Sequence, residues 1–237
     1  SVKREMVKDL GVAPDRITVT PLGLDAQYVP SPAEKVPSVV SKYGLLQGRY
    51  IISVGTKEPR KNLRRLLAAY AAMPDVLRRR FPLAVVGGVG WLLDDWSRLL
   101  SQWGLTDQVR TLGFVPQEDL PVLYSGATLM AYPSLYEGFG LPPLEAMGCG
   151  CPVLTSNVSS LPEVVGEAAC LVDPLNIEGI SAALVRILED SGERDRLRSL
   201  GMAQAKKFSW DRCALLTIGA YEKALGVSAI DRERTKG

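Results

Sequence analysis

Short apolar segments alternate with helical stretches along most of the chain. From Arg49 onward, runs rich in branched and aromatic residues are separated by amphipathic stretches. Near-continuous apolar strands separated by helices indicate a parallel sheet that is covered on both faces. The sequence therefore predicts an α/β fold, a Rossmann-like doubly wound parallel sheet of about six strands. The predicted strands are Tyr50–Val54, Leu83–Val86, Val109–Leu112, Thr128–Tyr132, Pro152–Thr155 and Ala169–Val172.

The intervening helices each show one apolar face. Asn62, Asn176 and Ser209 are predicted to begin three of them, because their side-chain oxygens can accept hydrogen bonds from free N–H groups. A further stripe between the second and third strands is expected to pack in the core rather than to bind a ligand. It consists of Leu92, Trp96, Leu99, Leu100 and Trp103.

The first 48 residues break the alternation. A charged helix is predicted over Val2–Leu10 and a short β run over Ile17–Thr20, followed by a proline-containing stretch. We expect residues 1–48 to be a hinge-like leading segment, residues 49–226 the Rossmann-like domain, and residues 227–237 a flexible tail. The leading segment suggests that the chain continues something upstream.

Composition excludes several function classes. The hydrophobic content of 46% and charged content of 23% are typical of a globular protein. A net charge of +2 gives no reason to expect nucleic acid as a partner. No apolar run approaches the roughly 20 residues of a membrane span, and no signal peptide is visible, so we expect a cytoplasmic protein. The basic clusters Lys3–Lys8 and Arg78–Arg80 are interpreted as solvated faces, with attraction to the inner face of the cytoplasmic membrane as the alternative.

Cysteine and histidine usage narrows the chemistry. Cys149, Cys151, Cys170 and Cys213 lie in apolar segments and are interpreted as buried small hydrophobic residues in a reducing compartment. The chain has no histidine, so neither a Ser-His-Asp nor a Cys-His site can form within it. A zinc site is weakly supported, and we expect no metal and no cofactor.

The loop after the first strand reads S-V-G-T-K-E-P-R-K-N. Gly55 allows a tight turn, and Arg60 and Lys61 stand just before the helix that Asn62 begins. Free N–H groups at a helix start beside two cations suit an anion such as a diphosphate. Taken alone, the loop favours the alternative of a capped surface helix with exposed charges.

A second segment reads Y-P-S-L-Y-E-G-F-G-L-P-P-L-E-A-M. Glu137 follows a strand, Gly138 and Gly140 leave the backbone approachable, and the prolines suit the first turn of a helix, where Glu145 is also expected. Carboxylates accept hydrogen bonds from paired hydroxyls such as those of sugars and ribose. Taken alone, Glu137 is better interpreted as a turn residue and Glu145 as a partner of the helix dipole. The whole segment, however, favours a binding site for a sugar or phosphate.

These segments together resemble the C-terminal domain of glycosyltransferase family four, one half of the two-domain GT-B architecture. The resemblance rests on SVGTKEPRKN, GFVPQEDLPVLYSGA (Gly113–Ala127), SLYEGFGLPPLEAM with its E-x7-E pair, and SNVSSLPEVVG (Ser156–Gly166). The resemblance extends from about Val2 to Leu225. Within the family, the sequence is most similar to bacterial mannosyltransferases that build surface polysaccharides.

The resemblance implies roles for individual residues. Glu137 would contact donor-sugar hydroxyls, Glu145 the ribose, and Lys61 with Arg60 the diphosphate. The arginine that often follows the loop glycine in this family is replaced by Thr56, which leaves open whether Arg60 supplies the guanidinium. The remaining residues expected around the donor are Gly55, Gly87, Phe114, Val115, Gly138, Phe139, Gly140, Leu141 and Glu163.

The resemblance also implies a reaction. A hexose, expected to be mannose from GDP-mannose, would pass to a polysaccharide or lipid-linked acceptor with retention of configuration and without a metal. The acceptor site and a histidine would come from a missing N-terminal domain, so the chain alone is expected to be inactive. A sugar-nucleotide 2-epimerase and a non-catalytic nucleotide-sugar-binding module are the alternatives. The base, the linkage and the oligomeric state stay open.

Overall fold

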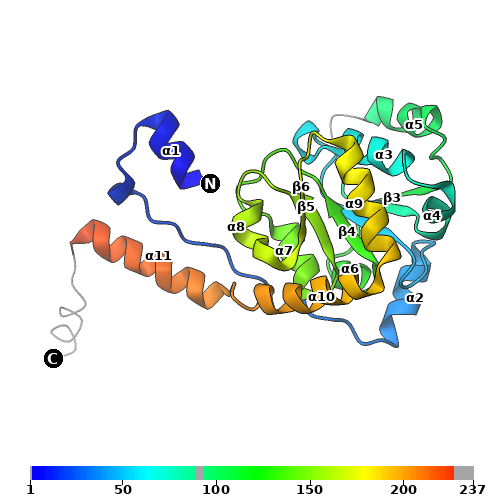
Figure 1. Ribbon diagram of the computed structural model, residues 1–237. Helices are drawn as coiled ribbons and strands as arrows, with labels where there is room; N and C mark the ends of the chain where they lie inside the picture. Colours follow the sequence, from blue (N-terminus) through cyan, green and yellow to red (C-terminus); the bar gives the residue numbers. More distant parts are fainter. Residues whose placement is uncertain (1, 89–92, 227–237) are drawn as a thin grey trace.

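Six parallel strands form the centre of the molecule. The computed structural model describes residues 2–88 and 93–226. The strands are β1 (Ile51–Val54), β2 (Leu83–Val86), β3 (Val109–Gly113), β4 (Leu129–Tyr132), β5 (Val153–Ser156) and β6 (Cys170–Val172). Their order in the sheet is β3-β2-β1-β4-β5-β6, and every neighbouring pair is parallel (Figure 1). The predicted α/β fold is confirmed, and each of the six predicted strands is correct to within one residue at either end.

The described residues form eleven helices, of which all but the two terminal ones pack around this sheet. They are α1 (Val2–Leu10), α2 (Lys35–Lys42), α3 (Leu63–Ala71), α4 (Asp75–Arg80), α5 (Leu93–Gln102), α6 (Leu120–Gly126), α7 (Leu141–Gly148), α8 (Leu161–Val165), α9 (Ile177–Glu189), α10 (Ser191–Ala205) and α11 (Trp210–Leu225). Short 3-10 turns occupy Pro14–Arg16, Pro59–Lys61 and Gly166–Ala168.

Two hydrophobic clusters lie on opposite sides of the strands. Ile52 and Met130 belong to the cluster that includes α2, α6 and α7, whereas Ile51 and Leu129 belong to the one that includes α3 and α9. Adjacent residues of a strand point to opposite faces, so a sheet buried on both sides needs apolar residues at successive positions. This explains why the strands read as continuous apolar runs.

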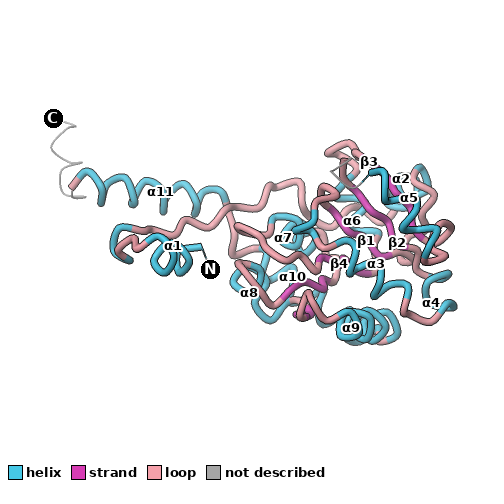
Figure 2. The backbone as a smooth tube through the Cα atoms, turned by 90° about the horizontal axis from the view of Figure 1, so that it is seen from above, coloured by secondary structure: helices cyan, strands magenta, loops and turns pink. Residues whose placement is uncertain are grey.

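The two terminal helices lie apart from the sheet. Neither α1 nor α11 has a buried residue, and both extend to the same side of the molecule (Figures 1 and 2). The ammonium group of Lys223 donates a hydrogen bond to the carbonyl of Asp15 across 2.8 Å, which joins the two segments. The predicted β run Ile17–Thr20 is wrong, because in the described part of the chain no strand pairs with it.

The predicted helix starts meet different outcomes. Asn176 and Ser209 accept hydrogen bonds from the N–H groups of Gly179 and Arg212, as predicted for N-caps. Asn62 stands at the N-cap position of α3, as predicted, but its predicted capping role is wrong, because its side chain makes no capping hydrogen bond. Its backbone is left-handed, with φ 59°, and the side-chain amide points elsewhere.

The apolar stripe and the cysteines mostly follow expectation. Trp96 and Leu100 are buried, and Leu99 and Trp103 pack against the same cluster; Leu92 lies outside the described residues. The four cysteines are free thiols. Those at positions 149 and 151 are buried as expected, but those at 170 and 213 are partly exposed, which corrects the interpretation of all four as buried.

The leading segment contributes to the core. Val36 and Val40 of α2 are buried in the same cluster as Val122 of α6. The division into residues 1–48, 49–226 and 227–237 stays a prediction, and its last part lies outside the described residues. No helix in the described ranges is long and apolar enough to cross a membrane.

Candidate functional site

The loops that follow the strands meet at the carboxyl edge of the sheet. Gly55 ends β1 with φ 150° and Gly87 ends β2 with φ 134°, a region that disfavours other residues. A Cβ atom at Gly87 would lie 2.1 Å from the carbonyl oxygen of Gly55. The two loops therefore approach more closely than any side chain would allow, as expected at the ligand edge of an open α/β sheet.

Asn62 joins the loop after β1 to two other loops. Its side-chain amide donates to the carbonyls of Pro133 and Pro174 across 2.8 and 2.7 Å. The backbone N–H of Leu135 donates to the carbonyl of Arg60 across 2.7 Å. Because buried amide–carbonyl pairs resist displacement, these bonds fix the Arg60–Lys61 turn against the segment that carries Glu137.

Glu137 is the centre of a largely buried group of hydrogen-bonded residues, which we name the Glu137 cluster: Glu137, Arg60, Lys61, Tyr132 and Ser134. One carboxylate oxygen accepts from Lys61, Tyr132 and Ser134, each across 2.7 Å. The other accepts from the Arg60 guanidinium across 2.9 Å. Lys61 also donates to the Tyr132 hydroxyl. Two cations and two hydroxyls thus converge on one carboxylate.

The cluster keeps Glu137 ionised although it is buried. Its side chain is 8% exposed and that of Lys61 is 10% exposed. Burial by itself raises the pKa of Glu137, but the hydrogen bonds from Lys61, Ser134 and Tyr132 outweigh it and hold the pKa below its ordinary value. The site therefore contains a carboxylate and two cations, which any incoming anion must separate.

Thr56 and Arg60 are connected through Glu58. The Thr56 hydroxyl donates to one oxygen of Glu58 across 2.6 Å, and Arg60 donates to the other across 2.9 Å. The Arg60 guanidinium, 45% exposed, therefore spans two carboxylates, those of Glu58 and Glu137. Thr56 and Arg60 are thus linked by the Glu58 carboxylate, which helps to orient Arg60.

The loop after Glu137 is supported by the loop after β5. The backbone N–H of Glu137 donates to the Ser159 hydroxyl across 3.0 Å, and the Ser160 hydroxyl bonds to the carbonyls of Glu137 and Phe139. Gly140 has φ 115° and precedes α7, which Leu141 begins. A Cβ at Gly138 would meet nothing within 4 Å, so the backbone there is approachable.

Glu145 lies in a different environment. It is in the second turn of α7, one turn later than predicted, because the helix begins at Leu141. It accepts a hydrogen bond from Tyr124 across 3.1 Å and another from Tyr28. Burial raises its pKa. Burial is the main cause that raises the pKa of Tyr132, and the charge of Glu137 and, to a smaller degree, that of Glu145 add to it. The two acids therefore have separate hydrogen-bond partners but both act on Tyr132.

Three further predicted residues, Phe114, Val115 and Glu163, are not members of the Glu137 cluster. Phe114 is 86% exposed after β3, whereas the adjacent Val115 is buried. Glu163 forms an ion pair of 2.8 Å with Arg4. Together with Gly138 and Phe139, Glu163 lines a cavity of about 520 Å³ beside α1.

Comparison with known proteins assigns the family. The model of the family "Glycosyl transferases group 1" matches residues 41–203. The chain belongs to this family. All the site residues predicted from the sequence fall within the matched range.

Individual relatives agree with the family. The group 1 chain is similar to the O-antigen chain mannosyltransferase B of Escherichia coli, with 46% identity over 93% of this chain and 58% of that protein. It is 35% identical to a serotype-specific mannosyltransferase WbdA of Escherichia coli over 95% of this chain but 28% of the relative. The chain thus spans about half of the first relative and less of the second.

A solved structure agrees with the fold. The sucrose-phosphate synthase of Thermosynechococcus elongatus superimposes with a TM-score of 0.79 and 27% identity, over 96% of this chain and 58% of that one.

Several residues of the group 1 site were missed by sequence reasoning. Tyr132 and Ser134 complete the Glu137 cluster, and Tyr124 holds Glu145. Their positions beside predicted strand and helix ends were visible, but no motif marks them.

Lys57 is 1% exposed, and its ammonium group donates to the Gly87 carbonyl across 3.3 Å. Burial lowers the pKa of Lys57. The sequence does not predict this burial, because the neighbouring residues of the loop are also charged.

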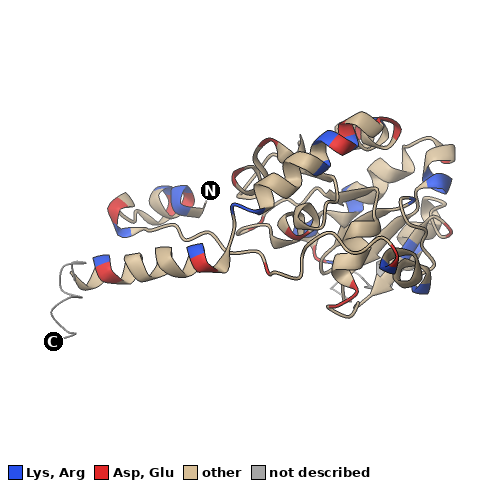
Figure 3. Ribbon diagram, turned by 90° about the horizontal axis from the view of Figure 1, so that it is seen from below, with Lys and Arg blue, Asp and Glu red and all other residues tan. Residues whose placement is uncertain are grey.

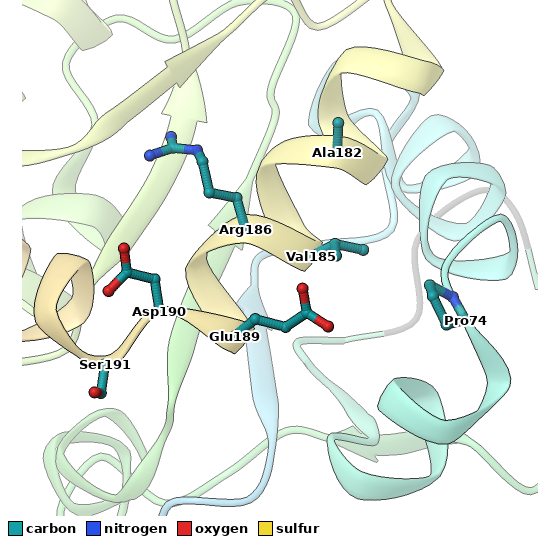
Figure 4. Close-up of a pocket in the computed structure, with 7 residues that line it drawn as sticks. All are labelled: Pro74, Ala182, Val185, Arg186, Glu189, Asp190 and Ser191. Carbon is teal, nitrogen blue, oxygen red and sulfur yellow. The ribbon is translucent and has the colours of Figure 1, made fainter.

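A shallow depression on the opposite side plays no part in this site. It measures about 760 Å³ and is lined by α9, the turn into α10 and Pro74 (Figure 4). None of the predicted residues lies in it. In residues 2–88 and 93–226, no three Cys, Asp or Glu side chains are grouped as metal ligands.

Proposed function

We propose that this chain binds the nucleotide-sugar donor of a retaining hexosyltransferase, with mannose from GDP-mannose as the transferred group. The Glu137 cluster carries the proposal: Lys61 and Arg60 meet Glu137 at the carboxyl edge of the sheet. The family match and the two Escherichia coli mannosyltransferases support the reaction class and the sugar. We propose a polysaccharide or lipid-linked acceptor, bound by a further domain of the working enzyme in the cytoplasm.

The cations act on the diphosphate. As the bond between the anomeric carbon and the diphosphate oxygen breaks, negative charge grows on the departing nucleotide. Lys61 and Arg60 stabilise that charge, because preorganised cations in a water-poor site interact strongly with it. They do so by transferring their hydrogen bonds from Glu137 to the phosphates.

Glu137 then acts on the sugar. Once its cations face the phosphates, its two oxygens can accept hydrogen bonds from donor hydroxyls, while Tyr132 and Ser134 keep the carboxylate in place. Its negative charge also stabilises an oxocarbenium-like transition state. Glu145 accepts hydrogen bonds from the ribose, and the exposed backbone at Gly138 approaches the sugar.

Titration calorimetry of the chain with GDP, UDP, ADP and their sugars tests the proposal. We expect GDP and GDP-mannose to bind, and Lys61→Ala to weaken both by about 10- to 100-fold, as for the loss of a buried charged partner. Lys42→Ala, which removes an exposed lysine from α2, is the matched control. If no nucleotide binds, or if both variants behave alike, the donor site is wrong.

Activity separates an enzyme from a binding module. In a protein that joins this chain to its acceptor-binding domain, Glu137→Gln should abolish mannosyl transfer. If the joined protein with its parent sequence binds nucleotide but transfers no sugar, the chain is a binding module instead.

A further inference from the structure

A second charged cavity lies at the opposite, amino end of the sheet. It measures about 190 Å³ and is bordered by residues just before three strands: Gly48 before β1, Phe81 before β2 and Thr128 before β4. The Glu137 cluster lies beyond the carboxyl ends of β1 and β4. A ligand in this cavity would therefore not touch the donor site.

Three arginines line this cavity and no acidic side chain does. Arg80 comes from the end of α4, and Arg194 and Arg198 come from α10. The last two are four residues apart, so they lie on the same face of the helix. Charged residues of both signs are spread along the ribbon (Figure 3), whereas all the charged residues of this lining are arginines.

The three guanidinium groups keep donors for a ligand. Among the described residues, Arg194 donates to two carbonyls, those of Ile187 and Leu188, each across 2.7 Å. Arg198 donates to the Gly150 carbonyl and is 3.6 Å from the carboxylate of Asp195. Arg80 stacks against Phe81, 5.1 Å from the ring centre, and forms no ion pair among the described residues.

A buried hydroxyl in the same lining points to a polar occupant. Thr128 is 7% exposed, and its side-chain oxygen has no hydrogen-bond partner in the described part of the chain. Buried polar atoms are nearly always satisfied, so this unpaired hydroxyl in the lining of the cavity is consistent with a polar occupant. This observation is independent of the arginines.

We propose that this cavity binds the phosphate group of a small phosphorylated compound or of a lipid headgroup. Arginine presents several donors in a plane that matches phosphate oxygens, and three such groups offset the charge of a phosphate. The volume is below the roughly 300 Å³ at which sites for larger organic ligands begin, so only the phosphate end enters.

Calorimetric titration with inorganic phosphate, against chloride at equal ionic strength, tests this site. Arg80→Gln removes a guanidinium that makes no hydrogen bond within residues 2–88 and 93–226, and we expect it to weaken phosphate binding by at least about fivefold. Arg79→Gln is the matched control, because Arg79 is the adjacent arginine, pairs with Asp75 and is absent from the lining. It should leave binding within about twofold.

A third variant separates this site from the donor site. Lys61→Ala should leave the Arg80-dependent binding of phosphate unchanged. If Lys61→Ala loses phosphate binding while Arg80→Gln retains it, the second site is overturned and the donor site stands. The absence of phosphate binding and of vesicle binding, or equal effects of Arg79→Gln and Arg80→Gln, would overturn it as well.

Vesicles distinguish the two sources of the phosphate. A lipid headgroup is identified if the protein sediments with phosphatidic acid vesicles but not with vesicles of phosphatidylcholine alone. This sedimentation should depend on Arg80 and not on Arg79. Arg80-dependent binding of free phosphate without sedimentation identifies a small solute. Either result supports the cavity as a phosphate site.

Discussion

Lys61 donates a hydrogen bond to Glu137 across 2.7 Å, although 76 positions separate them in the chain. Both side chains are at least nine-tenths buried, and Arg60 contacts the same carboxylate. The residues proposed to bind diphosphate and sugar therefore neutralise each other before the donor arrives. Donor binding becomes an exchange of ionic partners.

A double-mutant cycle measures this pair. Lys61→Met and Glu137→Gln keep the side-chain volumes while removing the charges. We expect each single variant to lose stability and the pair to show a coupling free energy of about 1–3 kcal/mol in denaturant unfolding. Because the folded pKa of Glu137 is lowered, its contribution is present above the unfolded pKa and is lost as pH falls through the folded pKa. Additive effects at neutral pH would mean that the contact contributes nothing.

Asn62 should stabilise the protein through its side-chain amide. Asn62→Gly removes the bonds to Pro133 and Pro174, and we expect a loss of about 1–3 kcal/mol in unfolding free energy. Asn62→Ala should cost about 1 kcal/mol more, because alanine disfavours the left-handed backbone at φ 59°. Urea denaturation of both variants measures the two contributions. Equal stability of the alanine and glycine variants would argue against the strain.

The close approach of two loops can be tested with adjacent glycines. Gly87→Ala places a methyl group against the Gly55 carbonyl and should cost about 3 kcal/mol or more. Gly88→Ala, whose Cβ would meet nothing within 4 Å, should change stability by less than about 0.5 kcal/mol. Thermal unfolding compares them directly. A mild effect at Gly87 would show that the loops can separate.

Glu145 should make stability depend on pH. Its folded pKa is raised by burial, so the stability it contributes is full below the unfolded pKa and is lost as pH rises through the folded pKa. Glu145→Gln should therefore be more stable than the parent protein near neutral pH, and this difference should vanish below about pH 4.3. Glu189→Gln, in the last turn of α9, is the control.

The same substitution should weaken nucleotide binding, since an amide accepts fewer hydrogen bonds from ribose than a carboxylate does. Equal nucleotide affinity in Glu145→Gln and the parent protein would remove the ribose role.

The sequence predicts what depends on local pattern. The six strands could be placed because a sheet covered on both faces requires continuous apolar runs, as in Leu83–Val86. Candidate site residues such as Glu137 and Lys61 could be predicted from sequence motifs. Their roles in donor binding stay predictions.

Long-range contacts could not be predicted in this way. Asn62 stands where a capping residue would, yet two prolines distant in sequence take its amide instead. Ile17–Thr20 has a strand composition, but a strand needs a neighbour to pair with. Lys57 is buried, with its ammonium group at the Gly87 carbonyl and over the ring of Trp96 in α5, and its charged neighbours in the sequence do not indicate this.

Binding of GDP and GDP-mannose to Glu137→Gln tests the central claim most directly. In the proposed mechanism, Glu137 competes with the diphosphate for Lys61 and Arg60 and contacts the sugar once the donor is bound. We therefore predict that the variant binds GDP as tightly as the parent protein or up to about tenfold more tightly, while the advantage of GDP-mannose over GDP disappears. An unchanged preference for GDP-mannose, or a loss of GDP affinity as large as that of Lys61→Ala, would contradict the account.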